Sequence, residues 1–244
     1  MTMQKADNKS AATFFKSFTR FTKENMILIA LFALTVIFSF TSKYFLTPNN
    51  LMTILIQSST IAIVSIGQAF VVIGGNLDLS LGQSVCLTSY IAAILMTRMQ
   101  VPPVIALLVC VIISCTIGAI NGFLVAYLRV SSFIATLGMM NVCTGIAKIL
   151  TGSATIANLP KSISFIGRGT LPLGIPVSVV IMLVLFVIAS FVARRTVLGR
   201  SIYANGGNRE AAYFSGINVR MYTLISFIIA GLLVGIGSIV LLSR

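Results

Sequence analysis

The chain of 244 residues has no histidine and only four acidic residues, Asp7, Glu24, Asp78 and Glu210. No two of these acids share an apolar stretch, so neither a carboxylate pair nor a Ser-His-Asp set can be assembled. The sequence also has no G-x-x-x-x-G-K-[ST] phosphate loop. We therefore expect no catalytic residue and no enzymatic activity, and any ATP consumed must be bound by another chain.

Cysteine is also scarce, with four residues and no C-x-x-C spacing. Each of them falls inside an apolar run: Cys86, Cys110, Cys115 and Cys143. Free cysteines in such surroundings behave as small buried hydrophobes, and without histidine they do not complete a zinc ligand set. The pattern favours structural thiols and indicates no metal site, disulfide or redox centre.

Charged residues make up only 9% of the chain, whereas hydrophobic residues make up 57% and the mean hydropathy is +1.05. A soluble domain carries about a quarter charged residues, so this composition is typical of a membrane protein. The net charge of +13 does not indicate a nucleic-acid partner, because the basic residues are not clustered on a soluble face. They lie mainly in the amino-terminal tail and at the ends of apolar runs.

Seven apolar runs can be marked along the sequence: 26–42, 51–73, 80–97, 103–127, 132–150, 175–193 and 221–242. Helical runs of about 17 to 25 residues cross a hydrocarbon layer of about 30 Å. They are too long and too uniformly apolar for the alternating strands of an outer-membrane barrel. We expect an all-α polytopic transmembrane bundle with about seven membrane helices.

Most basic residues fall on the inner side if the amino terminus is cytoplasmic, which is the bias that the positive-inside rule describes. The first run has no small-x-small cleavage site after it, so we interpret it as an uncleaved membrane helix. The sequence thus predicts a cytoplasmic basic tail over 1–25 and a transmembrane domain over 26–244. Within that domain, residues 194–220 form a cytoplasmic loop.

The stretch VVIGGNLDLSLGQSV predicts a very short link between two helices. Gly74 and Gly75 favour the end of one helix, and Ser80 with Gln83 has the form of a capping box that opens the next. Asp78 is the only acid between residues 25 and 209. A capped turn at the membrane interface and a direct contact with substrate both fit this aspartate.

Four amides lie within the apolar runs: Gln57, Gln68, Asn121 and Asn141. Because an unpaired amide is unfavourable in lipid, we expect these side chains to point into the bundle or to line a polar path. Such a path without intramembrane charge suits a neutral, polyol-like solute. Our candidate path residues, chosen by polarity and depth, are Gln68, Asn76, Asp78, Asn121, Thr136 and Asn141.

Two pairs of glycines have the small-xxx-small spacing, Gly118 with Gly122 and Gly231 with Gly235. This spacing lets helix backbones approach closely, and close packing is the simplest interpretation of both pairs.

The longest polar segment between two apolar runs is GRSIYANGGNREAAYFSGINVR, and it contains the signals of a short helix. Asn208 is a good N-cap, Glu210 places negative charge in the first turn, and Gly216 stands where a left-handed C-cap is expected. Two turns of helix are too short to be stable alone, so the helix must lie against something. A solvated helix on the lipid headgroups is one interpretation.

The same segment resembles the cytoplasmic signature of the permease subunits of ribose-type sugar importers of the ATP-binding-cassette class. Further similarities are GGNLDLSLG, FLTPNNLMTILIQSS and RVSSFIATLGMMN, and together they extend from about residue 45 to residue 244 in the order of the family. The agreement of several motifs is more specific than any one of them.

The resemblance implies a permease subunit in a bacterial inner membrane that forms a path for a monosaccharide. It implies three protein partners: an ATPase that binds ATP and magnesium, a second permease copy or paralogue, and an extracytoplasmic sugar-binding protein. No cofactor is expected in this chain itself. The coupling helix that would dock on the ATPase is implied to use Asn208, Arg209, Glu210, Ala211, Ala212, Ser215 and Gly216.

Two other classes of function stay open. One is an ATP-independent facilitator or secondary transporter, although proton coupling would depend on Asp78 or Lys148, the only titratable candidates within the bundle. The other is a structural membrane subunit. The resemblance also implies a family chain that continues past IVLLSR with further membrane helices, so a fragment, a truncated reading frame and half of a split permease are all compatible with this sequence.

Overall fold

The computed structural model describes residues 25–152, 154–157 and 159–244. Within these ranges the secondary structure is helical, and the only extended pairing is an isolated bridge between Thr170 and Pro176. The all-α prediction is therefore confirmed. The basic tail predicted for 1–25 lies outside the described residues, apart from Asn25.

Seven long helices correspond to the seven apolar runs: α2 (Met26–Thr41), α3 (Pro48–Ile73), α4 (Leu81–Thr97), α5 (Pro103–Ala126), α6 (Ser132–Thr151), α8 (Val177–Arg195) and α11 (Val219–Leu242). Five of them are long and apolar enough to cross a membrane, while α2 and α4 are shorter, with 16 and 17 residues. The remaining elements are short: η1 (Lys161–Ile163), α7 (Ser164–Arg168), η2 (Pro172–Gly174), α9 (Val197–Gly207) and α10 (Arg209–Phe214).

The chain divides into two compact units, one up to Thr53 and the other from Ile54 to Arg244. The described part of the first unit contains α2 and the beginning of α3. No residue of α2 is buried. After α2, the chain turns with the Asn50 side chain donating a hydrogen bond to the Phe45 carbonyl at 2.7 Å.

The core of the second unit is the contact between α5 and α11, where glycines allow the two backbones to meet. A Cβ atom added at Gly118 would strike the Phe227 carbonyl and lie 3.2 Å from the Gly231 Cα. One added at Gly122 would lie 3.0 Å from the Phe227 side chain. The close-packing interpretation of the small-xxx-small pairs is confirmed, because both pairs lie in this one interface.

Other helices pack around this pair. A cluster of buried side chains joins α3 and α4 to α11, with Val71 and Val85 against Phe227, Ala230 and Val234. The contact between α3 and α11 is also close, since a Cβ atom at Gly67 would lie 3.0 Å from the Ala230 Cα. Helix α6 packs on α4 and α5.

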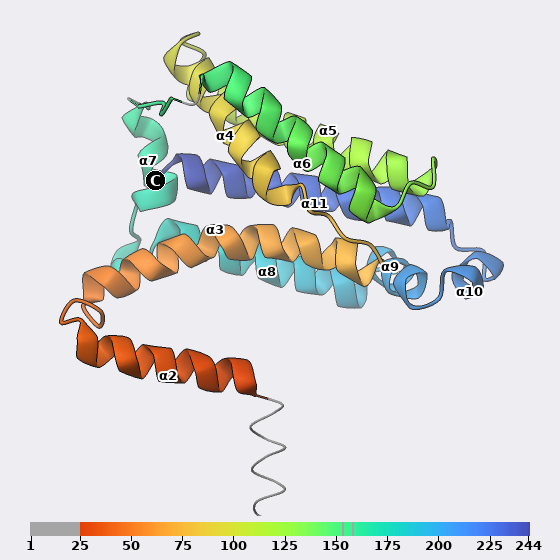
Figure 1. The fold of residues 1–244 in the computed structure, drawn as a ribbon, viewed down its shortest axis with the longest axis horizontal. Coiled ribbons are helices and arrows are strands. Elements are labelled where there is room, and N and C mark those ends of the chain that lie inside the picture. Colours follow the sequence, from red (N-terminus) through yellow and green to blue (C-terminus); the bar gives the residue numbers. More distant parts are fainter. Residues whose placement is uncertain (1–24, 153, 158) are drawn as a thin grey trace, which may run out of the picture. The chain divides into compact units, whose positions relative to one another are not determined.

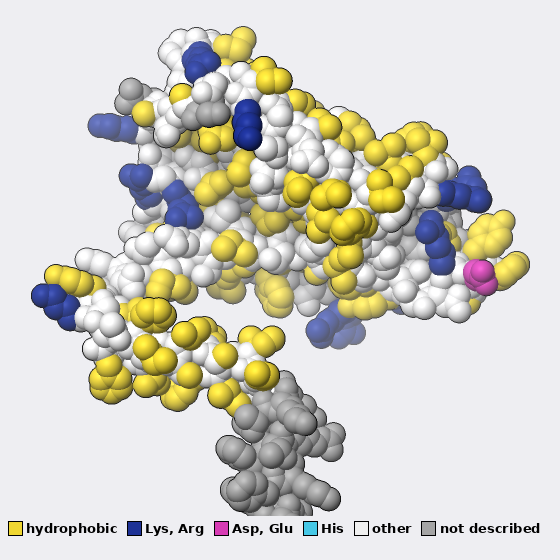
Figure 2. Space-filling model, viewed as in Figure 1, with side chains coloured by type: hydrophobic (Ala, Val, Ile, Leu, Met, Phe, Trp, Pro, Cys, Tyr) yellow, Lys and Arg dark blue, Asp and Glu magenta, His cyan; other side chains and the backbone are white. Residues whose placement is uncertain are grey.

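Figure 1 shows α11 extending between the two ends of this unit, one with α7 and the chain's carboxyl terminus and the other with α9 and α10. Lys and Arg side chains gather at these two ends, and hydrophobic side chains cover much of the face between them (Figure 2). This distribution is the one expected for helices surrounded by lipid between two polar layers.

Candidate coupling site

The turn between α3 and α4 begins with a glycine-terminated helix end, as the sequence predicted. Gly75 has a φ of +80°, its N–H donates to the Val72 carbonyl at 2.9 Å, and the Asn76 N–H donates to the Val71 carbonyl at 3.0 Å. This pair of hydrogen bonds is the Schellman motif, which satisfies carbonyls at the helix end and favours glycine at the left-handed position.

The predicted capping box at the start of α4 is wrong. Ser80 has a helical backbone conformation and its side chain caps no amide of α4. The acceptor is Asp78 instead, whose Oδ1 accepts hydrogen bonds from the Ser80 N–H at 2.8 Å and from the Ser80 hydroxyl at 2.6 Å. In a capping box, the Gln83 side chain would accept a hydrogen bond from the Ser80 N–H. Here the Asp78 side chain accepts it instead and forms an Asx turn.

Asp78 is only 4% exposed. Burial raises the pKa of its carboxyl, and the two hydrogen bonds from Ser80 oppose that shift. On the other side of Ser80, the Asn121 amide of α5 donates to the Ser80 hydroxyl at 2.9 Å. Asp78, Ser80 and Asn121 therefore form one buried polar cluster that fixes the turn to α5.

Two further bonds fix the same turn to the start of α6. The Leu77 N–H donates to the Ser132 hydroxyl at 3.2 Å, and the Leu79 N–H donates to the Thr136 hydroxyl at 3.1 Å. Thr136 is fully buried. Three of the candidate path residues, Asp78, Asn121 and Thr136, are thus brought together around the turn, where they satisfy backbone and side-chain groups of this chain.

The other candidate path residues lie apart from that cluster. Asn76 donates to the Gly74 carbonyl at 3.0 Å within the turn. Asn141 is exposed on α6 and donates to the Leu137 carbonyl of its own helix at 2.9 Å. Gln68 is half-buried, while Gln57 is exposed. Of the four amides in the apolar runs, only Asn121 is fully buried in the bundle, and Asn141 satisfies its donor within its own helix.

Helix α10 has the two ends that the sequence predicted. The Asn208 side-chain oxygen accepts a hydrogen bond from the Ala211 N–H at 3.0 Å. Gly216 has a φ of +80°, and the Ile217 N–H donates to the Ala212 carbonyl at 3.0 Å. These contacts cap both ends of a helix of six residues.

The residues implied for coupling divide into two groups. Ala212 is 3% exposed and packs within this chain. The others lie on the surface of the loop: Asn208, Arg209, Glu210, Ala211, Ser215 and Gly216. Sequence reasoning missed Tyr213 and Phe214, which are 68% and 84% exposed and meet edge to face with their ring centroids 5.7 Å apart. The signal that could have identified them is the presence of two adjacent aromatic residues inside a polar segment.

Sequence reasoning also missed α9, the helix before α10. Thr196 caps it by accepting a hydrogen bond from the Gly199 N–H at 3.2 Å. Asn205, near its carboxyl end, is 5% exposed and donates to the Thr223 hydroxyl of α11 at 3.1 Å and to the Gly74 carbonyl at 3.5 Å. The segment 194–220 is therefore two capped helices held against the bundle.

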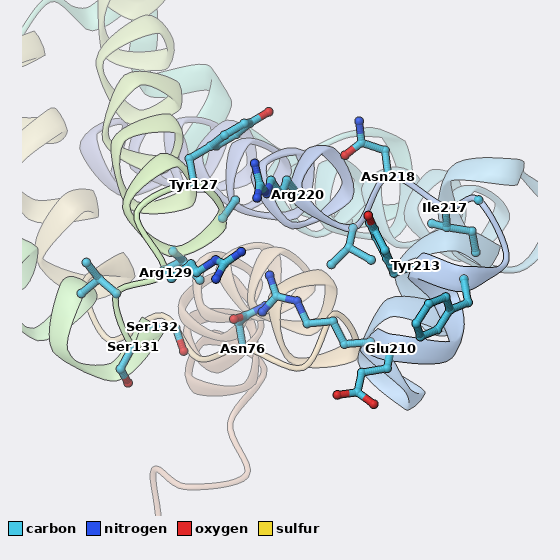
Figure 3. A pocket seen from close by; sticks show the side chains of 17 residues that line it. Asn76, Tyr127, Arg129, Ser131, Ser132, Glu210, Tyr213, Ile217, Asn218 and Arg220 are labelled. Carbon is cyan, nitrogen blue, oxygen red and sulfur yellow. The ribbon is translucent and has the colours of Figure 1, made fainter.

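A groove of about 1630 Å³ lies between α10, the start of α11 and the turn from α5 to α6. Three arginines line it, Arg129, Arg209 and Arg220, and Glu210 is the one acid among its lining residues. In Figure 3 Arg129 comes from the turn after α5 and Arg220 from the start of α11, and the Glu210 carboxylate is directed away from both. The groove is thus electropositive, with the α10 aromatics at its rim.

These features define a multi-pass helical membrane protein with a short, capped helix at one end of the bundle. Residues 50–244 match the family described as branched-chain amino acid transport system / permease component. The chain therefore belongs to this family of transport-system permeases, which confirms the resemblance noted from the sequence.

The relatives of this chain include permease proteins of sugar import systems in Escherichia coli. The ribose import permease protein is 37% identical over 91% of this chain and 70% of its own length. The D-allose transport system permease protein is 34% identical over 89% of this chain and 65% of its own length. The galactose/methyl galactoside import permease protein is 33% identical over 91% of this chain and 71% of its own length.

The chain thus spans 65% to 71% of the length of these relatives. No solved structure matches it.

Proposed function

We propose that this chain is the membrane subunit, or part of it, of an importer driven by a separate ATPase, and that it contributes to the path of a monosaccharide. The observation that carries the proposal is α10, a capped helix that presents two adjacent exposed aromatic rings. ATP and magnesium would be held by the partner ATPase. A second permease copy or paralogue and an extracytoplasmic sugar-binding protein would complete the importer.

The orientation is inferred from the excess of basic residues in the amino-terminal tail and at the α10 end of the sequence. The segment 194–220, from the last residues of α8 to the start of α11, contains Arg194, Arg195, Arg200, Arg209 and Arg220. By the positive-inside rule this end faces the cytoplasm of a bacterial inner membrane, and the amino terminus would lie on the same side. That placement puts α10 where a cytoplasmic ATPase can reach it.

The surface of α10 fits a protein partner better than water. Phe214 and Tyr213 expose most of their ring surface, and large exposed aromatics are enriched at the centres of protein interfaces. The caps at Asn208 and Gly216 hold the short helix before any partner binds. A preformed helix reduces the conformational entropy lost on docking.

The groove beside α10 adds electrostatic complementarity. Arg129, Arg209 and Arg220 line it with a single acid, so it favours acidic side chains on the ATPase. The aromatic rings would supply most of the affinity and the arginines would set the orientation of the partner.

The experiment is a binding measurement in detergent with the cognate ATP-binding-cassette ATPase. We expect the parent to bind and Phe214→Ser to bind at least about tenfold more weakly, or about 1.4 kcal/mol. Arg209→Glu should weaken binding as well, because it reverses one of the positive charges that the groove offers to acidic side chains of the ATPase. Phe165→Ser is the matched control, since Phe165 is 58% exposed at the α7 end.

Unchanged affinity in Phe214→Ser and Arg209→Glu, with a folded chain in each case, would contradict the docking role of α10. A parent that binds no ATPase would contradict the importer proposal and favour a passive facilitator.

A further inference from the structure

The end of α9 touches the α3–α4 turn through backbone atoms. A Cβ atom at Gly206 would strike the Ile73 carbonyl, and one at Gly75 would lie 3.3 Å from the Gly206 Cα. Next to this contact, the Asn205 side chain bridges the Gly74 carbonyl and the Thr223 hydroxyl. Close-packed backbone cannot move independently, so a displacement of α9 must also displace the turn.

The opposite side of the same turn is bonded to α5 and α6. Its Leu77 and Leu79 N–H groups donate to Ser132 and Thr136, and its Ser80 hydroxyl accepts from Asn121. The turn therefore lies between α9 on one side and two bundle helices on the other. Helix α10 packs on α9 and on the start of α11.

Three buried oxygens along the contacts from α9 through the turn to α5 have no hydrogen-bond partner among the described residues: Asn205 Oδ1, Asp78 Oδ2 and Asn121 Oδ1. Each can accept a further hydrogen bond without breaking one that already exists. Buried polar groups with unused capacity are where a network can adopt a second arrangement.

We propose that Asn205 and Gly206 are positioning residues that transmit movement of the coupling loop to α4, α5 and α6 through the α3–α4 turn. This inference rests on the proposed docking of an ATPase on α10. It assigns Asp78, Asn121 and Thr136 to the transmission of movement, where sequence reasoning had placed them on the substrate path. Such transmission requires an element in contact with both sites, and the turn contacts α9 as well as α5 and α6.

The test is hydrogen exchange of residues 74–80 in the complex of this chain with its ATPase, with and without ATP and magnesium. The amides of this turn make the hydrogen bonds in question, so their exchange reports them directly. We expect nucleotide to change the exchange rate of the turn by about threefold or more in the parent. Asn205→Leu removes both hydrogen bonds of the Asn205 side chain and keeps a side chain of similar size. We expect this variant to bind the ATPase but to lose the effect of nucleotide on the exchange of the turn.

Tyr203→Leu is the matched control, because Tyr203 is on α9 but half exposed, and it should keep the nucleotide effect. If Asn205→Leu does not fold, the double variant Ser132→Ala, Thr136→Val provides a second test on the far side of the turn. It removes the acceptors of the Leu77 and Leu79 N–H groups, so the turn should still respond while the first turn of α6 no longer does.

An equal nucleotide effect in Asn205→Leu and the parent would overturn the inference while the importer proposal stands. So would a parent complex in which the turn does not respond, or a response in the double variant Ser132→Ala, Thr136→Val that still reaches α6. A parent that binds no ATPase would overturn both the inference and the proposed function.

Discussion

The α5–α11 interface and the α10 loop use small and large side chains in opposite ways. In the interface, Gly118 and Gly231 remove side chains so that backbone meets backbone inside the bundle. In the loop, Tyr213 and Phe214 present large rings outside it. The first arrangement maximises packing within this chain, and the second leaves contact surface for another protein.

The largest expected effect comes from filling the interface. Gly118→Leu should destabilise the fold by about 3 kcal/mol, because the new side chain meets the Phe227 carbonyl and the Gly231 backbone. Thermal unfolding in detergent measures this. Gly138→Leu is the control, since nothing lies within 4 Å of a Cβ atom there, and a similar loss in that variant would contradict the packing account.

A second test compares two neighbouring glycines of α9. Gly206→Ala should destabilise by about 1 to 3 kcal/mol, because its Cβ strikes the Ile73 carbonyl. Gly207→Ala should be neutral or stabilising by up to about 1 kcal/mol, since the space beside Gly207 is open and alanine favours helix. Equal melting temperatures for the two variants would show that α9 does not rest on the α3–α4 turn.

Asp78→Ala should lower the free energy of unfolding by about 1 to 3 kcal/mol, because it removes the acceptor for the Ser80 N–H and hydroxyl. Asp78→Asn keeps an acceptor oxygen and should lose less. Thermal unfolding of the three proteins measures the difference, and equal losses in the two variants would contradict this role of the acceptor.

The stabilities of the parent and of Asp78→Asn should also depend differently on pH. Burial raises the pKa of Asp78 in the folded chain. Its contribution to stability is therefore full below the unfolded pKa of about 4 and falls as pH rises through the folded pKa. Asp78→Asn, which does not titrate there, should gain on the parent as pH rises above about 4. Melting temperatures that run parallel over this range would contradict the raised pKa.

The smallest effect is expected at the exposed loop. Asn208→Ala should cost about 1 kcal/mol of local helix stability, because the Ala211 N–H loses its acceptor. Hydrogen exchange over 209–214 should accelerate while the melting temperature of the bundle stays the same. A matching drop in the melting temperature would show that α10 is part of the core and not a separate surface element.

Local signals in the sequence predicted most of the helices, the glycine ends at Gly75 and Gly216, and the Asn208 cap, because each depends on neighbouring residues. The contacts of Asn121 and Thr136 could not be predicted in the same way. Their partners lie in the α3–α4 turn, 41 and 57 residues away in the chain, whereas Asp78 bonds locally to Ser80. Polarity and depth alone placed them on a substrate path, and only the geometry shows the turn that they hold.

The missed elements have similar causes. Helix α9 is polar and glycine-rich at its end, so neither apolar periodicity nor length indicated it. Tyr213 and Phe214 were visible in the sequence, but only the structure shows that both rings face outward.

The most direct test of the central claim is a cross-link from the docking helix. Phe214→Cys in a Cys86→Ser, Cys115→Ser background leaves only the buried Cys110 and Cys143 as native thiols. Labelled with a thiol-reactive photo-cross-linker and mixed with the ATPase, this chain should form a covalent product. Phe165→Cys, treated in the same way, should form none. A product from position 165 and none from position 214 would contradict the account.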